Sequence, residues 1–298
     1  MFNSIPGHKW PTRRVHDSLR KAPSALRSII INLLLFQILL SASSVAADPG
    51  PTPEYGLFRD GYYAGKVFLY DTGYILTSPL RLTGRQALVW GGIFAVTAVV
   101  YAYDQEILDT VQDSRYTPGI KWFHEMGEFF EPLGHMGTMN KYYFGGLAVS
   151  YVVKHDKATR IFAEILESHF IAGMGKNVAN TLAGRARPHE EQGPYSWGND
   201  GSTSFPSGHA INIFQLATVL SHHANRTWFS IGAYAIAASV GVQRVMSDAH
   251  WTSDVIVSAA FGTAVARCVV LLHERYGGPR PTVTATPGGP IVGLAWRF

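Results

Sequence analysis

The sequence predicts an all-α fold: a bundle of about six core helices with a polar site at one end, an N-terminal signal segment and a short strand-like C-terminal tail. Two observations support this prediction. Six apolar runs rich in Ala, Leu, Ile and Phe are long enough for helices, and they span residues 87–103, 142–153, 161–178, 211–220, 228–242 and 255–272. In addition, the apolar–polar alternation typical of strands does not occur before the last residues.

The first 47 residues have the composition of a targeting segment. A small-residue sequence, SASSVAAD, follows the apolar stretch Ile29–Leu40, and six basic residues precede it: Lys9, Arg13, Arg14, Arg20, Lys21 and Arg27. We therefore expect export to the periplasmic side through a signal peptide or, as the alternative, an uncleaved anchor helix. Residues 48–86 contain Tyr, Gly and Pro in a mixed composition and are interpreted as an amphipathic entry segment.

The helical domain is predicted to span residues 87–276, and a different composition follows it. Gly277–Gly289 is rich in Gly, Pro and Thr and is interpreted as a linker. The last stretch, PIVGLAWRF, alternates loosely and predicts one strand. Residues 277–298 are therefore expected to form a linker and a tail.

Composition excludes several classes of protein. The chain has 298 residues, of which 47% are hydrophobic and 15% charged, so it is apolar for a soluble protein and polar for a bundle of membrane spans. The net charge of +4 is mild, and no basic run with interleaved aromatic residues predicts nucleic-acid binding. Cys268, the only cysteine, cannot form an internal disulfide and is expected to be a small buried hydrophobe.

Two arguments about the membrane disagree. Basic residues in the short connections (Lys154, Lys157, Arg160 and Arg226) place the long connections 104–141, 184–207 and 243–251 outside under the positive-inside rule. Most apolar runs, however, are shorter than the roughly 20 residues needed to span a bilayer. A cleaved signal also cannot coexist with six spans that place the long loops outside. We therefore expect a soluble or membrane-peripheral domain, with an integral inner-membrane protein whose site faces outside as the alternative.

The first polar cluster is NTLAGRARPH, residues 180–189. Arg185 and Arg187 follow an apolar helix, which Pro188 terminates because it lacks an N–H donor and restricts its neighbour. Each guanidinium has a fixed fork of donors that matches the oxygens of phosphate. The alternative is that these arginines only interact with the C-terminal end of the helix dipole.

The second cluster is SFPSGH, residues 204–209, at the start of another apolar run. A helix is predicted to begin near Pro206, so that Ser207, Gly208 and His209 lie in its first turn. Backbone N–H groups there have no intrahelical acceptor and can bind an anion, which Gly208 allows to approach closely. The alternative is an ordinary N-cap with an incidental histidine.

The third cluster is QRVMSDAHWTSD, residues 243–254. Arg244 ends one helix, Ser247 or Asp248 is expected to cap the next, and His250 lies near its start. Asp254 is four residues further, on the same helical face, where a carboxylate would fix the tautomer of His250. A metal site and a surface salt bridge are the alternatives for this pair.

The presence of all three clusters in one chain favours an anion site. Because successive helices alternate in direction, all three clusters are expected at one end of the bundle. That end would then collect three arginines, two histidines, an N-terminal turn of backbone amides and one carboxylate. An anion with several oxygens is the charge that this set would balance, whereas the arginines would repel a metal ion held by His209, His250 and Asp254.

The clusters resemble the type 2 phosphatidic acid phosphatase and vanadium haloperoxidase superfamily. The family pattern is Lys, six residues, Arg-Pro; then Pro-Ser-Gly-His; then Ser-Arg, five residues, His, three residues, Asp. The chain matches it at Arg187-Pro188, at Pro206-Ser207-Gly208-His209, and at Arg244, His250 and Asp254. Asn180 stands where the family has Lys, and Gln243 where it has Ser. Lys176, one helical turn before Asn180, is expected to reach the same anion.

The resemblance implies a phosphatase mechanism without a metal or other cofactor. His250 would attack phosphorus and form a phosphohistidine, Asp254 would orient it, and His209 would protonate the leaving oxygen and then activate water. The phosphoryl oxygens would be held by Arg187, Arg244, Ser207, Gly208, Lys176 and Arg185.

The expected function is that of an exported, acid-phosphatase-like hydrolase. Its substrates would be phosphate monoesters or pyrophosphates on a small molecule or, given the apolar composition, a lipid, with membrane association and no nucleic-acid partner. The alternatives are a phosphotransferase, a vanadate-dependent haloperoxidase and a degenerate anion-binding protein.

Overall fold

The computed structural model describes residues 57–153, 155–276, 280–286 and 289–295. The predicted signal segment, residues 1–47, lies outside the described residues. The all-α bundle is confirmed, and its helices in chain order are α3 (Leu57–Leu76), η3 (Ser78–Arg81), α4 (Gly84–Ala102), α5 (Asp104–Asp113), α6 (Pro118–Phe130), η4 (Glu131–Gly134), α7 (Met136–Val152), α8 (Asp156–Ala183), η5 (Pro188–Glu190), α9 (Gly208–Ala224), α10 (Thr227–Met246) and α11 (Thr252–Tyr276). The connection 104–141, expected to be a long loop, is therefore largely helical.

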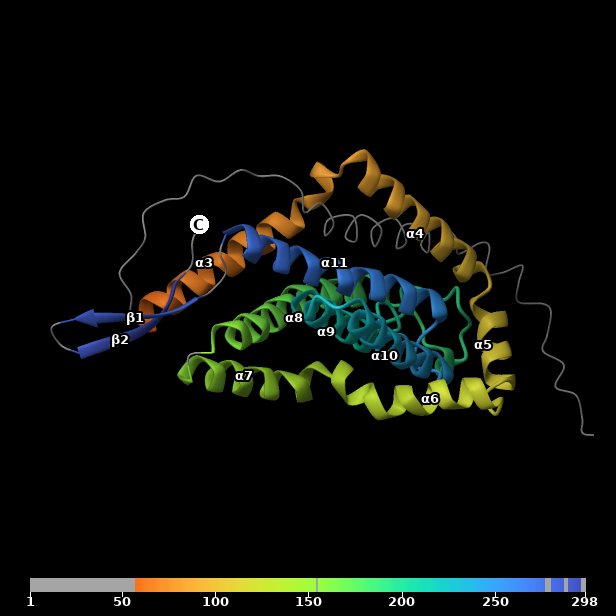
Figure 1. Cartoon of the computed structure of the whole chain (residues 1–298). Coiled ribbons are helices and arrows are strands. Elements are labelled where there is room, and N and C mark those ends of the chain that lie inside the picture. The colour runs from red at the N-terminus through yellow and green to blue at the C-terminus, as the bar shows by residue number, and fades with distance from the viewer. Residues whose placement is uncertain (1–56, 154, 277–279, 287–288, 296–298) are drawn as a thin grey trace, which may run out of the picture.

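Helix α9 lies at the centre of the bundle, against α8, α10 and α11 (Figure 1). Helices α6 and α7 run along one side of this group, and α3 and α4 run along the side of α11. Ile211 on α9 and Val265 on α11 are fully buried in one apolar cluster, and Val219 on α9 and Val240 on α10 are buried in another. A side chain at Gly262 would overlap the carbonyl of Ile211, so this glycine allows α9 and α11 to approach closely.

The helix ends follow from local residue chemistry. Thr83 and Gln86 form a reciprocal capping box at the start of α4. Gly184 ends α8 in the left-handed conformation, with a φ of 49°. Ser207 caps α9, and its Oγ accepts a hydrogen bond from the N–H of Ala210. The first sequence cluster therefore contains the end of α8, and the second contains the start of α9.

Most apolar runs were expected to be too short to span a membrane, and three of the helices contradict this expectation. Helices α8, α10 and α11 have 28, 20 and 25 residues, because each extends past its apolar run into polar turns. Three helices are long and apolar enough to cross a membrane: α4, α10 and the stretch Thr252–Arg275 of α11. Helix α4 has no buried residue, and Leu88 on its surface is 79% exposed. Such an exposed apolar helix indicates membrane association.

Two strands form the tail, where the sequence predicted a linker and one strand. Strands β1 (Arg280–Thr286) and β2 (Gly289–Ala295) pair antiparallel, with Val283 opposite Val292. The first strand thus occupies most of the predicted linker, a correction with a simple cause. A lone strand would leave its backbone N–H and C=O groups unpaired, and the Thr-Val-Thr sequence at 282–284 favours a strand. The hairpin lies at the end of the bundle opposite α5 (Figure 1).

Candidate active site

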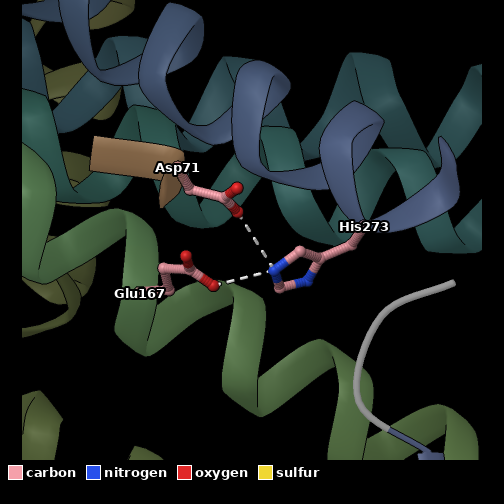
Figure 2. A group of neighbouring side chains, drawn as sticks. All are labelled: Asp71, Glu167 and His273. Carbon is pink, nitrogen blue, oxygen red and sulfur yellow. Dashed lines mark ion pairs between the residues drawn. The ribbon is translucent and has the colours of Figure 1, made fainter. Parts of the chain in front are cut away.

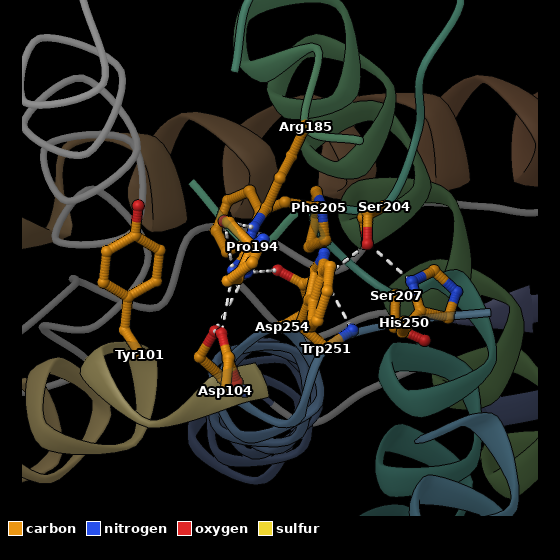
Figure 3. A network of polar contacts seen from close by, with 12 residues as sticks. Tyr101, Asp104, Arg185, Pro194, Ser204, Phe205, Ser207, His250, Trp251 and Asp254 are labelled. Atoms are coloured by element: carbon orange, nitrogen blue, oxygen red, sulfur yellow. Dashed lines mark hydrogen bonds and ion pairs between the residues drawn. The ribbon is translucent and has the colours of Figure 1, made fainter. Parts of the chain in front are cut away.

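The structure brings the three sequence clusters together at one end of the bundle, as their alternating helices predict (Figure 3). The loop after α8 contacts the α10–α11 connection, because the Trp251 indole N–H donates to the Ala186 carbonyl over 2.8 Å. The start of α9 contacts α11, because the Ser207 N–H donates to Oγ of Ser258 over 2.7 Å. These contacts join segments more than 40 residues apart in the sequence.

His250 is held as a neutral imidazole. Its ring is 4% exposed, and Nδ1 lies 2.6 Å from the carbonyl oxygen of Ser204. Since a carbonyl can only accept, Nδ1 carries the proton and Nε2 carries the lone pair. Burial and then the charges of Arg187 and Arg244 lower the pKa of His250 well below its usual value. The imidazole therefore has the tautomer and the charge that a nitrogen nucleophile requires.

Asp254 does not pair with His250 as predicted. Its Oδ2 accepts hydrogen bonds from the Ser204 hydroxyl at 2.6 Å and the Trp251 N–H at 3.2 Å, and its Oδ1 accepts one from Arg185. The prediction is wrong because α11 begins at Thr252, so His250 precedes the helix and the i, i+4 spacing does not place both on one helical face. Asp254 instead reaches His250 through Ser204, whose hydroxyl binds the carboxylate and whose carbonyl binds the imidazole.

The predicted cap of α11 is also wrong. Ser247 is the C-cap of α10, and Asp248 has a φ of 54° in the left-handed region, where it forms the turn between the two helices. Asp254 itself binds the N–H of Trp251 before the first turn of α11. An acidic residue there interacts favourably with the positive end of the helix dipole.

Arg185 is not available to bind phosphate, contrary to the prediction (Figure 3). Its side chain is 1% exposed, and every one of its N–H groups has an acceptor. Nε and Nη2 donate to the Pro194 carbonyl, Nη2 also to Asp104, and Nη1 to Ser253 and Asp254. A guanidinium has five N–H donors, so none remains for a ligand.

The sequence reasoning missed Asp104. Its side chain is fully buried at the start of α5, where Oδ2 accepts from Arg185 at 2.8 Å and Oδ1 from the backbone N–H of Ser253 at 2.9 Å. The only available signal was an acidic residue directly after the long apolar run 87–103. Asp104 lies 81 positions from Arg185, and local spacing cannot reveal such a pairing.

His209 and Arg244 share a carboxylate, Glu131, that the sequence reasoning also missed. Oε1 of Glu131 lies 2.7 Å from Nε2 of His209 and accepts a hydrogen bond from Nη1 of Arg244 over 2.9 Å. Burial, Arg244 and His135 lower the pKa of His209 to about 4, and Glu131 opposes this shift. Glu131 comes from η4, a segment without a recognisable motif.

The remaining predicted phosphate ligands surround the start of α9. Ser207 is the N-cap rather than a first-turn residue, while Gly208 and His209 open the helix. The stem of Lys176 lies against Gly208, where an added Cβ would be 3.2 Å from its Cε. Arg187 donates from Nη2 to Oγ1 of Thr203 over 3.0 Å, and its charge acts on both His250 and Lys176.

Asn180, which stands in the usual Lys position, has a structural contact. Its side-chain amide donates to the Phe205 carbonyl over 2.6 Å and thereby holds the loop that precedes α9. Lys176, one turn earlier on α8, is the residue that lies against Gly208. The position of the family lysine and the position of the cation near α9 therefore differ in this chain.

Comparison with known proteins agrees with the three motifs. Residues 162–278, which include all of them, match the PAP2 superfamily. This part of the chain therefore resembles the PAP2 superfamily in both sequence and motifs. It is 38% identical over 207 residues to a lipid A 1-phosphatase of Porphyromonas gingivalis, a match that covers 68% of this chain and 41% of the relative. A lipid A 1-phosphatase of Rhizobium etli is 32% identical over 125 residues, covering 39% of this chain and 52% of the relative.

The chain spans only about half the length of the curated relatives it matches. Among solved structures, the crystal structure of Aquifex aeolicus LpxE is similar, with a TM-score of 0.40 and 21% sequence identity. That match covers 56% of this chain and 93% of the other.

Proposed function

We propose that this chain is a phosphatase that hydrolyses a lipid-linked phosphate through a phosphohistidine on His250. One observation carries the proposal most directly: a buried, neutral imidazole presents a nitrogen lone pair beside the charges of Arg187 and Arg244. A nucleophile must be deprotonated, and cations near it stabilise the negative charge that gathers on the phosphoryl oxygens. The site combines both requirements.

The proposed first step moves the phosphoryl group onto the enzyme. Nε2 of His250 forms a bond to phosphorus while the bond from phosphorus to the leaving oxygen breaks. Protonated His209 donates its Nε2 proton to that oxygen, so the lipid leaves as an alcohol. Arg187, Arg244, Lys176 and the first-turn amides of α9 hold the phosphoryl oxygens.

The proposed second step uses the same groups in reverse. His209, now neutral, accepts a proton from water, and the water oxygen attacks phosphorus. The bond between phosphorus and Nε2 of His250 breaks, and phosphate leaves. Ser204 keeps Nδ1 protonated throughout, because its carbonyl accepts the hydrogen bond from the ring.

The position of the site supports a lipid substrate. Helices α4, α10 and α11, the three that could span a membrane, each have one end at the site. Helix α4 ends at Ala102 just before Asp104, α10 ends just after Arg244, and α11 begins just after His250. If these helices span a bilayer, the site lies at its surface, where lipid phosphates are. The names of the relatives, lipid A 1-phosphatase, support lipid A as the substrate that we propose.

Phosphate release by the purified chain in detergent tests this proposal. We expect turnover of lipid A and a weaker reaction with phosphatidic acid, undecaprenyl pyrophosphate or a soluble nucleotide. Vanadate should inhibit, because it occupies a phosphoryl site. The His250→Ala variant should lose turnover, with His124→Ala on α6 as the matched control. Equal phosphate release by the wild type and His250→Ala would mean that the chain binds anions without catalysis.

Cell fractionation tests the proposed location. If α4, α10 and α11 span the inner membrane, carbonate washing should leave the protein in the membrane pellet. Release into the wash would instead support a peripheral domain on the periplasmic side. Externally added protease should cleave near the site end in spheroplasts and leave it intact in whole cells; cleavage only after lysis would place the site in the cytoplasm.

A further inference from the structure

A second polar cluster lies outside the candidate active site, where α3, α8 and α11 meet (Figure 2). It consists of Asp71, Glu167 and His273, and we call it the three-helix cluster. The side chains of Asp71 and His273 are each 3% exposed, and that of Glu167 is 11% exposed. Glu167 precedes the end of α8 by more than four turns, about 24 Å along the axis. The cluster is therefore separate from His250 and its surroundings.

The three side chains converge on one point. Nε2 of His273 lies 2.8 Å from Oε2 of Glu167 and 3.5 Å from Oδ2 of Asp71. One potential ligand atom from each residue can be chosen so that all lie within 4.8 Å of one another. Figure 2 shows both carboxylates directed at the same nitrogen of the imidazole.

Hydrogen bonds within the chain do not satisfy this cluster. A single Nε2–H can donate to only one of the two carboxylates, and Glu167 is the nearer. Across the described ranges, Oδ2 of Asp71 and Oε1 of Glu167 are buried without a hydrogen-bond partner. Burying a carboxylate oxygen without a partner is costly, so a cation bound between the two carboxylates would stabilise the cluster.

The nearby basic side chains of Arg160 and His223 already pair with another carboxylate, that of Glu164. Glu164 is fully buried, and it accepts from Nε of Arg160 at 2.7 Å and pairs with Nε2 of His223 at 2.6 Å. Its Oε1 also lies 3.5 Å from Nδ1 of His273. Glu164 thus has two close partners of its own and can, in addition, orient the imidazole of His273 from its other side.

We infer that Asp71, Glu167 and His273 bind a divalent transition-metal ion of the zinc class. One imidazole nitrogen and two carboxylate oxygens form a ligand set that suits zinc, whereas magnesium and calcium prefer oxygen alone. Two ligands of a tetrahedral zinc ion lie about 3.3 Å apart, and the separations of 2.8 and 3.5 Å at Nε2 bracket that value. The ion would replace the proton on Nε2 and satisfy both carboxylates.

Glu164 provides a carboxylate next to the second ring nitrogen of His273, as is usual for a metal-bound histidine. With Nε2 as the ligand, Nδ1 carries the proton and faces Oε1 of Glu164. A carboxylate that accepts from the second nitrogen fixes the ring and strengthens its donation to the metal. The ion would have a structural role, because it would join α3 to α8 and α11, far from the proposed reaction.

Metal content tests this inference in the full chain, purified in detergent with its tag removed. We expect about one zinc ion per chain after incubation with zinc and desalting, and a rise in Tm of about 5 °C or more relative to metal-free protein. Asp71→Asn should reduce the bound zinc at least tenfold and abolish the rise in Tm. The matched control is His222→Gln, since His222 forms an exposed pair with Glu274 on the same end of the bundle.

The wild type alone can overturn the inference if Asp71→Asn does not fold. Absence of tightly bound zinc in the wild type, or a bound ion whose X-ray absorption spectrum lacks imidazole and carboxylate ligands, would contradict it. So would full zinc retention by a folded Asp71→Asn variant. A cluster that shares a proton instead of a metal would take up no zinc, and its Tm would respond to pH but not to zinc. None of these results depends on phosphatase activity.

Discussion

Two charged groups meet at the same end of the bundle, and they are organised in opposite ways. In the first, which we call the paired group, Arg185 lies between the carboxylates of Asp104 and Asp254, and all three are buried. In the second, the open group, the cations Arg187, Arg244 and Lys176 outnumber the single carboxylate of Glu131.

The difference shows where an anion can bind. The paired group has more carboxylates than cations and no remaining arginine donor, so it acts as a scaffold that positions Ser204 and, through it, His250. The open group has excess positive charge around the neutral imidazole of His250, so a phosphoryl group would balance it. Two arginines only two residues apart in the sequence therefore have different tasks.

The largest expected effect is that of removing the proposed nucleophile, His250, from the open group. His250→Ala should lower kcat by about 10³-fold or more, since it removes the nitrogen that would form the covalent intermediate. Thermal unfolding and circular dichroism should show a folded protein, because the change leaves the paired group intact. Residual activity within tenfold of the wild type would show that His250 is not the nucleophile.

Replacing each of the two neighbouring arginines by alanine, one at a time, would directly distinguish the roles of the two groups. Arg185→Ala leaves Asp104 and Asp254 buried without their cation and should destabilise the fold by about 3–5 kcal/mol. Arg187→Ala should change the unfolding free energy by less than about 1 kcal/mol and mainly lower kcat/KM, by about 10²-fold. Urea unfolding and steady-state kinetics on both variants check this. A stable Arg185→Ala enzyme with weakened phosphate binding would invalidate the distinction.

Glu131 offers a finer test of the open group, because it contacts both His209 and Arg244. Glu131→Gln keeps the shape but removes the charge that supports a protonated His209. We expect kcat to fall by about tenfold with an alkyl phosphate, whose leaving oxygen needs a proton. With p-nitrophenyl phosphate, a good leaving group, the decrease should be much smaller. Equal losses with both substrates would mean that Glu131 does not act through proton transfer.

The pH profile of the wild type tests the open group without any substitution. In the proposed mechanism His209 must be protonated in the first step, and its pKa is lowered to about 4. Above that pKa the protonated fraction decreases as pH rises, so kcat/KM should increase as the pH is lowered from 8 to 5. His250 stays neutral over this range because its pKa is also lowered. In Glu131→Gln the decrease of kcat/KM with rising pH should begin at a lower pH than in the wild type. An unchanged pH profile would mean that a group other than His209 causes this decrease.

Much of the fold and part of the site follow from the sequence. Apolar runs of helical length predict the bundle, and the alternating direction of successive helices predicts that clusters 180–189, 204–209 and 243–254 meet at one end. The spacing of Arg187, His209, Arg244 and His250 within recognisable motifs predicts the chemistry of the site. These features depend on residues close together in the chain, where period and spacing are sufficient.

Only the tertiary structure decided which partners these side chains take. It paired Arg185 with Asp104, separated Asp254 from His250 through Ser204, placed Glu131 between His209 and Arg244, and brought Asp71 to His273. Each of these contacts joins segments far apart in the sequence, and local spacing carries no record of such pairings. Buried charges must find partners wherever packing brings them, so their roles depend on three-dimensional neighbours, whereas the helices depend on local pattern.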